Sequence, residues 1–179
     1  MRAAQDGILE LHRALSVHGG TLAASLLDAP RRPDDQQLPG PPQLAALGPR
    51  ASGHEAEYEL LLEMILEGTL LHYGVPRVLR DDDRDLSLLL GDQLYALGLS
   101  RLAEVGDLDA VAELADLISL LATASAADRP ELVAAIWQGG AAAIGWGTTP
   151  EHEAAKALAR SADPGAAAAL TASAARAGS

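Results

Sequence analysis

Apolar residues recur at helical spacing along most of the chain, and the alternating pattern of a β-strand is absent. Leucine and isoleucine follow this spacing within residues 3–28, and again within residues 55–74 and 85–105. The middle stretch is apolar around nearly its whole circumference, which is typical of a helix buried in a bundle or between subunits. The sequence therefore predicts an all-α fold.

Glycine and proline interrupt this pattern in the first third of the chain. Gly19 and Gly20 fall inside the first apolar stretch, where we expect a kink or a close approach. Residues 29–54 contain six prolines and several charges, which predict a loop or linker with a short helical turn at residues 44–47.

Capping residues place the later helices. Asp107 follows Gly106 and is expected to cap a helix that ends near residue 124. Asp128 and Glu131 have the spacing of a capping box for a helix that ends near residue 145, and Thr149 precedes a proline that suits a first helical turn.

The predicted helices suggest one main domain. We expect a helical bundle over residues 1–162, with residues 29–54 as a Pro-rich loop or linker inside it. Residues 163–179 are rich in alanine and predict a C-terminal helix or tail with little apolar surface to bury.

Charge and composition narrow the classes of function. The chain has 179 residues, a formal net charge of −12, no cysteine and a single lysine, Lys156. Nucleic-acid binding needs clustered Lys and Arg, so no nucleic-acid partner is expected, whereas a basic protein partner would suit this charge. The apolar runs are shorter than a transmembrane segment requires and no signal peptide is evident, so we expect a soluble cytoplasmic protein.

Residues 63–75 read E-M-I-L-E-G-T-L-L-H-Y-G-V. This segment resembles the metal-binding helix of trans-polyprenyl diphosphate synthases, which reads roughly E-x-x-H-x-x-S-L-L/I-H-D-D-V. His72 matches, but Tyr73 and Gly74 stand where the family has the two aspartates that hold magnesium.

Two further segments resemble the same family, in the same order along the chain. Residues 15–27 are similar to the G-G-K-R-L-R-P-x-L pattern, which binds isopentenyl diphosphate, and residues 88–98 are similar to A-I-L-A-G-D-x-L-x-A-x-A. The last match is a packing motif. The resemblance is carried by Gly19, Gly20, Gly91 and Asp92. The chain departs from the family at three positions: Thr21 replaces the Lys, Leu22 the first Arg and Ala24 the second Arg.

The resemblance covers roughly residues 15–110 and implies a truncated isoprenoid-synthase-like helical bundle. The diphosphate-binding cations are replaced, and residues after 110 supply no second aspartate-rich motif. The nearest relatives by this argument are the small, non-catalytic subunits of heterodimeric hexaprenyl and heptaprenyl diphosphate synthases. The resemblance thus implies no cofactor in this chain, no enzyme activity on its own, and a catalytic subunit as partner that holds the magnesium.

In such a subunit, apolar helices would border the tunnel that receives the prenyl product chain. The resemblance points to eight candidate tunnel residues: Leu62, Leu66, Thr69, Leu70, Tyr73, Leu90, Leu94 and Leu97.

Two other functions stay open. Asp81, Asp82 and Asp85 spell D-D-x-x-D, so the chain could be an active magnesium-dependent prenyl synthase. These aspartates also precede an apolar helix, and carboxylates are stabilised near the positive end of the helix dipole at its N-terminus. The second alternative is a homodimeric pseudo-enzyme that binds an apolar or prenyl ligand.

Three further features of the sequence can be explained by structure alone, and two of them also have a functional interpretation. Glu55, Glu59, Glu63 and Glu67 recur every four residues, and we expect a solvated helix face, with contact to an Arg-rich partner as the alternative. Residues 151–153 (E-H-E) are expected to serve the first turn of a helix rather than a metal. Trp137 and Trp146 would either fill the core or anchor an interface.

Overall fold

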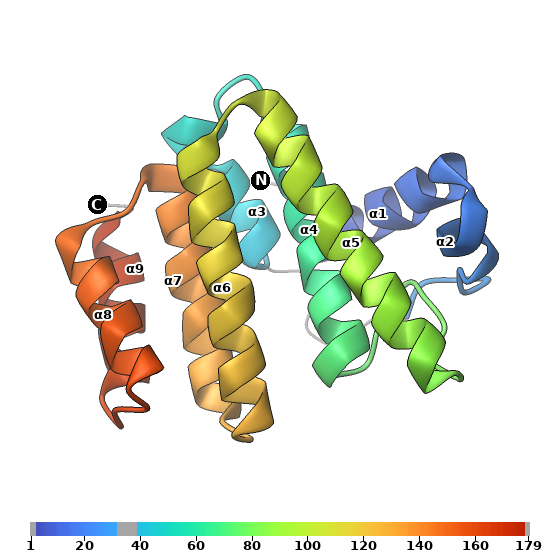
Figure 1. The fold of residues 1–179 in the computed structure, drawn as a ribbon. Coiled ribbons are helices and arrows are strands. Elements are labelled where there is room, and N and C mark those ends of the chain that lie inside the picture. Colours follow the sequence, from blue (N-terminus) through green and yellow to red (C-terminus); the bar gives the residue numbers. More distant parts are fainter. Residues whose placement is uncertain (1–2, 32–38, 178–179) are drawn as a thin grey trace. The chain divides into compact units, whose positions relative to one another are not determined.

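The computed structural model describes residues 3–31 and 39–177 (Figure 1). The described part of the chain is helical and contains no strand beyond one isolated antiparallel bridge between Leu26 and Leu79, so the predicted all-α class is confirmed. Of the predicted loop at 29–54, residues 32–38 lie outside the described ranges, as do residues 1–2 and 178–179 of the predicted domains. The elements are α1 (Ala4–His18), α2 (Gly20–Ala24), α3 (Pro41–Ala46), the 3₁₀ turn η1 (Pro49–Ala51), α4 (Glu55–Tyr73), α5 (Arg84–Val105), α6 (Leu108–Ala126), α7 (Pro130–Trp146), α8 (Pro150–Arg160) and α9 (Ala166–Ala177).

The chain forms two compact units. The first unit comprises Met1–Gln43 and Ala56–Arg101, and the second comprises Leu44–Glu55 and Leu102–Ser179. The boundaries fall inside α3, α5 and the first turn of α4, so each of these helices contributes residues to both units.

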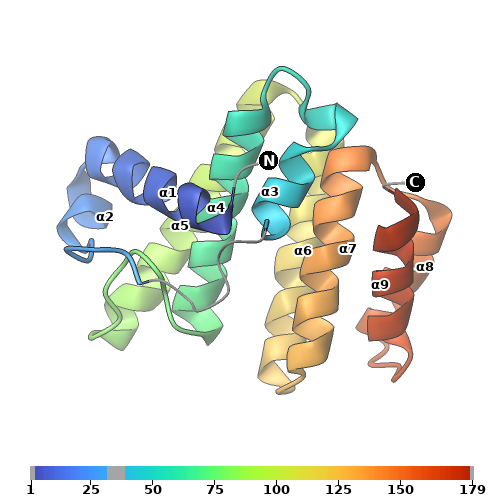
Figure 2. The ribbon, with the colours of Figure 1, turned by 180° about the vertical axis from the view of Figure 1, so that it is seen from behind.

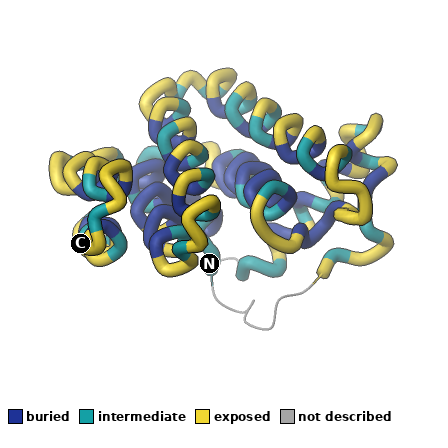
Figure 3. The backbone as a smooth tube through the Cα atoms, turned by 60° about the horizontal axis from the view of Figure 1, so that its bottom comes forward, coloured by how far each residue is buried: buried dark blue, intermediate teal, exposed yellow. Residues whose placement is uncertain are grey.

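The core of the first unit is formed where α1, α4 and α5 pack together. Leucines of α1 and α5 and Met64 of α4 bury their side chains in one cluster, together with Val78 and Leu79 of the following segment. Helix α4 is buried along most of its length, as its apolar circumference predicts (Figure 3). The expected interruption at Gly19-Gly20 is also confirmed, because both residues have positive φ (+79° and +63°) and α1 ends at His18.

The acidic stripe of α4 is not a solvated face, so that prediction is wrong for three of its four residues. Glu55 is exposed, but Glu59, Glu63 and Glu67 are almost fully buried within the first unit. Gln43 donates hydrogen bonds to Glu59 (3.2 Å) and Glu63 (2.7 Å). Because burial disfavours the charged carboxylate, the pKa of Glu63 is raised.

The side chain of Glu67 satisfies the backbone hydrogen-bond donors of residues 77–79. Its carboxylate accepts hydrogen bonds from the backbone N–H groups of Arg77 (2.8 Å), Val78 (2.7 Å) and Leu79 (3.2 Å). The guanidinium of Arg77 lies 3.1 Å from the same carboxylate and 2.8 Å from that of Glu63. A buried carboxylate is tolerated when it is paired and hydrogen-bonded, and the stripe therefore serves inside its own unit rather than towards a partner.

The segment held by Glu67 in turn pairs with the chain that follows α2. Leu27 donates a backbone hydrogen bond to Val78, Arg31 donates to Arg77, and Arg80 donates to Ser25. This short antiparallel pairing ties the chain after α2 to the α4–α5 connection.

In the second unit, α7 packs between α6 and α9, and α8 lies along α9 (Figures 1 and 2). The Ala-rich end of the chain is therefore a packed helix, with Ala166, Leu170 and Ser173 buried. Gly48 and Gly145 allow η1 and α7 to approach at backbone distance, since a Cβ on either would overlap backbone atoms of the facing segment.

Two of the three predicted caps in this unit are confirmed. The side chain of Asp107 accepts from the N–H of Ala110 (3.0 Å), and that of Thr149 accepts from the N–H of His152 (3.2 Å). The capping box at Asp128 is wrong: Arg129 occupies the N-cap, and Asp128 has φ +51°. Asp128 instead closes the end of α6 by donating its N–H to Ser125, and such turns favour a left-handed residue.

Replacement of Glu67 by Gln should destabilise the first unit strongly. Glutamine keeps one acceptor oxygen but removes one of the two buried negative charges that face Arg77, and breaking a buried pair costs about 3–5 kcal/mol. Urea unfolding followed by circular dichroism would measure this loss, with Glu104→Gln on the exposed face of α5 as the control. A loss at Glu67 no larger than at Glu104 would contradict the role assigned to the carboxylate.

Candidate functional site

The residues that resemble the synthase motifs of α4 and α5 lie together in the first unit. The ring of His72 lies directly over Gly91, where a Cβ would come within 2.6 Å of Nε2. Nε2 is also 3.2 Å from a carboxylate oxygen of Asp92, without the alignment of a hydrogen bond. Two segments that are separate in sequence therefore meet at one helix contact.

Tyr95 completes this contact. Its ring stacks on that of His72, with centroids 5.3 Å apart and planes 7° from parallel. Its hydroxyl donates to Thr69 (3.2 Å), which itself donates to Ile65 of the preceding turn. Burial raises the pKa of Tyr95 to about 12, so the hydroxyl stays a hydrogen-bond donor at any physiological pH.

Tyr73 and Gly74, at the positions of the family's aspartates, mark the exposed end of α4. The ring centroids of Tyr73 and His72 are 5.6 Å apart, and Tyr73 is 46% exposed to solvent. Val75 and Leu89 are also exposed, at 64% and 66%, and belong to the same end of the helix pair. This end of the helix pair therefore exposes three apolar side chains, together with the carboxylate of Asp92.

The candidate tunnel residues separate into two groups. Leu62, Thr69, Leu90 and Leu94 are buried, and the last two pack in the core against leucines of α1. The others keep accessible surface: Leu66, Leu70 and Leu97 are half-buried and Tyr73 is exposed. Within this second group, Leu97 packs against the core of the first unit, and Tyr73 has the largest accessible surface.

The degenerate diphosphate motif lies at the break between α1 and α2. Open space surrounds Gly19 and Gly20, so their glycine identity serves the positive φ rather than a close approach. Thr21 and Ala24 are exposed, and Leu22 is buried in the core.

Two of the aspartates within residues 81–85 have structural partners. Asp83 accepts from the N–H groups of Asp85 (3.0 Å) and Leu86 (3.1 Å), as an N-cap does. Asp81 pairs with Arg31 at 2.8 Å, which holds the pKa of this exposed carboxyl below its usual range. In the described ranges, three or more His, Asp or Glu side chains are nowhere arranged to hold a metal.

A second polar cluster, in the other unit, was missed by sequence reasoning. Glu113 of α6 lies 2.7 Å from Nε2 of His152 and 2.6 Å from Nζ of Lys156, both on α8, and all three are buried. Lys156 also pairs with Asp116 (2.9 Å) and Glu153 (2.8 Å). His152 is thus part of a buried network, whereas the sequence assigned it only to a helix start.

A signal for this cluster exists in the sequence. On α6, Glu113 and Asp116 are three residues apart, and on α8 His152, Lys156 and Arg160 are four apart, so each set lies on one helix face. Arg160 pairs with Asp116 at 2.6 Å. Two faces of opposite charge at matching spacing predict packed neighbours.

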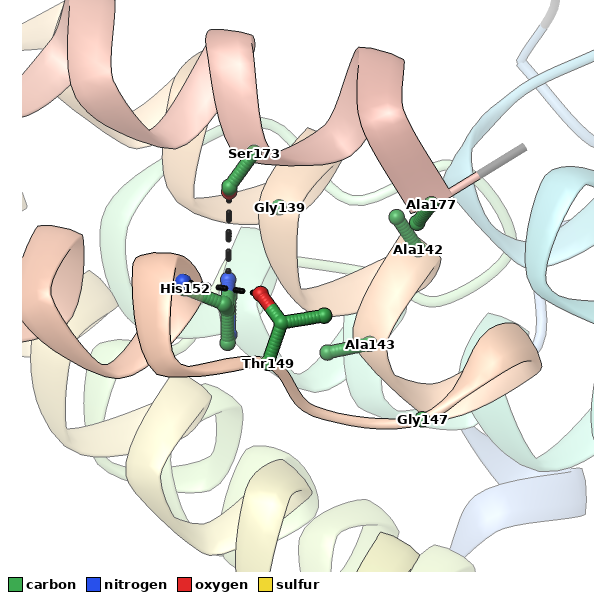
Figure 4. Close-up of a pocket in the computed structure, with 8 residues that line it drawn as sticks. All are labelled: Gly139, Ala142, Ala143, Gly147, Thr149, His152, Ser173 and Ala177. Carbon is green, nitrogen blue, oxygen red and sulfur yellow. Dashed lines mark hydrogen bonds between the residues drawn. The ribbon is translucent and has the colours of Figure 1, made fainter. Parts of the chain in front are cut away.

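Ser173 of α9 extends the cluster. Its hydroxyl lies 3.4 Å from Nδ1 of His152 (Figure 4). The same hydroxyl donates to the carbonyl of Leu170 (2.8 Å). The cavity beside it, between Thr149, Gly139 and Ala177, measures ≈ 10 Å³, enough for about one water. The Ser–His–Glu order is therefore a buried structural network rather than a site open to a substrate.

The two tryptophans have different environments. Trp137 is buried and fills the core of the second unit. Trp146 is half-buried and lines an open groove of ≈ 280 Å³ with Leu44, Gln138, Ala142, Thr171, Ala174 and Ala175.

Comparisons with known proteins do not place the chain in a family: no family model, curated protein or solved structure matches it. The resemblance to polyprenyl diphosphate synthases therefore stays an expectation from the motifs. None of the helices in the described residues has the length and apolar character needed to cross a membrane.

Replacement of Gly68 by Ala should separate α4 from α5. The new Cβ would lie 3.0 Å from the carbonyl oxygen of Gly91 and 2.9 Å from the ring of Tyr95, and the backbone oxygen cannot yield. Overpacking costs roughly 1–3 kcal/mol, and the better helix propensity of alanine returns at most about 1 kcal/mol. Thermal unfolding should show a lower midpoint than wild type, while Ser100→Ala, exposed on α5, should leave it unchanged; a stabilised Gly68 variant would exclude the tight contact.

Acid should weaken the second unit through Glu113. Burial alone would raise the pKa of Glu113, but hydrogen bonds from His152 and Lys156 outweigh it and leave the pKa below its usual range. A lowered folded-state pKa contributes stability above the unfolded value, near pH 4.5, that is lost as pH falls through the folded value. Urea midpoints between pH 7 and pH 3 should therefore fall more steeply for wild type than for Glu113→Gln, and parallel curves would refute this contribution.

Proposed function

We propose that this chain is a non-catalytic subunit of a heteromeric polyprenyl diphosphate synthase, which supports the catalytic subunit and helps to set the length of the prenyl chain. The observation that carries the proposal is the meeting of His72 with Gly91 and Asp92. Two of the three segments that resemble the family meet at one helix contact, although nothing in their separate patterns requires it.

The chemistry would belong to the partner. In the proposed complex the catalytic subunit holds magnesium, and ionisation of the allylic diphosphate, attack by isopentenyl diphosphate and proton loss take place there. Tyr73 and Gly74 offer no carboxylate, and Thr21, Leu22 and Ala24 offer no cation for a diphosphate.

The contribution of this chain would be an apolar surface. The exposed end of the α4–α5 pair, with Tyr73, Val75 and Leu89, is the surface we assign to the catalytic subunit. Of the candidate tunnel residues, those with accessible surface (Leu66, Leu70, Tyr73 and Leu97) would border the growing chain, and the buried ones would support them. Bulk at these positions would limit the chain length.

A prenyl-transfer assay tests the proposal. Farnesyl and isopentenyl diphosphates with Mg²⁺ are given to this chain alone, to a candidate catalytic subunit encoded in the same genome, and to the mixture. We expect turnover with a defined product length in the mixture only. In that mixture Tyr73→Ala should lengthen or broaden the products because bulk is removed, and Leu66→Ala should act in the same direction.

The control is Leu108→Ala, a more exposed apolar residue of the second unit (68%), which should leave the products unchanged. Unchanged products from both Tyr73→Ala and Leu66→Ala would remove the tunnel role. Turnover by this chain alone, abolished by alanine at Asp81, Asp82 and Asp85, would establish the active synthase instead.

A second candidate function is favoured by one observation, the groove at Trp146. Its walls are uncharged in a chain of net charge −12, so it would suit an apolar ligand in a pseudo-enzyme without turnover. In the same experiment, a homodimer by gel filtration that gives no stimulation with the catalytic subunit would favour this alternative.

A further inference from the structure

Asp92 is an exposed carboxylate beside exposed apolar side chains. Its side chain is 71% exposed, and its nearest contact is with Nε2 of His72 at 3.2 Å, without the alignment of a hydrogen bond. Leu89 lies three residues earlier on α5, so the two side chains are neighbours on the helix surface. The end of α4, with Tyr73 and Val75, lies beside the first half of α5 in both views (Figures 1 and 2). We call Tyr73, Val75, Leu89 and Asp92 the α4–α5 face.

In the part of the chain that the structure describes, no arginine or lysine pairs with Asp92. Arg84 does reach this end of the helix pair, but its guanidinium donates to the backbone carbonyls of Leu71 (3.1 Å) and His72 (2.9 Å) at the end of α4. Water therefore solvates most of the carboxylate of Asp92 in the isolated chain.

This carboxylate restricts the kind of surface that can cover the α4–α5 face. A protein that covers Leu89 also removes water from Asp92, because the two residues are one helical turn apart. A carboxylate that loses its water without gaining a charged partner is strongly destabilising. A partner that buries this face must therefore bring a cation to Asp92, and the net charge of −12 favours a basic partner in the same way.

We propose that an arginine of the catalytic subunit pairs with Asp92 when that subunit covers the α4–α5 face. The inference rests on the proposed function, which assigns this face to the catalytic subunit. Arginine suits the position better than lysine, since a guanidinium is less strongly hydrated and its parallel N–H groups match the two oxygens of a carboxylate. The methylene groups of the same arginine would lie on Leu89.

Such a pair would decide which proteins can bind. Tyr73, Val75 and Leu89 surround it with apolar surface that keeps water out, which is the environment in which an interfacial ion pair contributes most. A related subunit without the arginine would leave Asp92 buried and unpaired, so the same carboxylate that attracts the right partner rejects the others.

Isothermal titration calorimetry tests the pair, with the full chain and the candidate catalytic subunit of the same genome. Asp92→Asn keeps the shape of the side chain and removes its charge, and we expect it to weaken binding about 30-fold or more. Asp92→Arg should weaken it further. The matched control is Glu104→Gln, which removes one exposed negative charge from the other end of α5 and should leave the affinity unchanged.

A double-mutant cycle then identifies the partner residue. Each exposed arginine of the catalytic subunit is replaced by glutamine and titrated with wild type and with Asp92→Asn. One arginine should weaken the binding of wild type and have little further effect on Asp92→Asn. Circular dichroism of the Asp92 variants should match that of wild type, because the side chain is exposed.

The outcomes separate this inference from the proposed function. If wild type binds and stimulates the catalytic subunit, but Asp92→Asn binds as tightly as Glu104→Gln or no arginine is coupled to Asp92, the inference alone is overturned. If wild type neither binds nor stimulates the catalytic subunit, the proposed function fails and the inference with it. A dimer of this chain alone that Leu89→Asp dissociates would show that a second copy covers the face, and would also overturn the inference.

Discussion

The first unit depends on one buried carboxylate. Glu67 accepts the N–H groups of three consecutive residues, and these are the residues against which the chain after α2 is paired. A loop at that depth would otherwise carry unsatisfied donors, each of which costs more than an ordinary hydrogen bond gains. Glu67 therefore makes the segment that carries Val78 and Leu79 compatible with burial in the core that α1, α4 and α5 share.

The second unit solves a similar problem differently. There the buried carboxylate of Glu113 holds side chains of another helix instead of backbone, through His152 and Lys156. The short alanine-rich helix α8 has little apolar surface of its own, so its ion pairs with α6 make up much of what orients it. A helix held by ionised side chains is more sensitive to protonation than one held by leucines.

The helices were predictable, because their apolar spacing and their caps are local properties of the sequence. Asp107 and Thr149 cap as their neighbours suggest, and the double glycine breaks the first helix. What the sequence could not show is which charged residues are buried: Glu63 and Glu67 look like a solvated face until Arg77 and Gln43, distant in sequence, lie against them. Asp128 was misassigned because a turn into the next helix and a cap for it favour the same residue type. The contact of His72 with Gly91 followed from no local pattern, and the function it suggests stays a proposal from resemblance.

Lys156 gives the chain an unusual chemical property. It is the only lysine among the 179 residues, and its amine is enclosed by Glu113, Asp116 and Glu153. These carboxylates raise its pKa well above the usual range and keep it protonated, so in the folded chain it is a poor nucleophile as well as an inaccessible one. Acylating reagents, amine-directed crosslinkers and lysine-modifying enzymes would therefore find no side-chain target until the second unit opens, and the labelling of one residue would then report that opening.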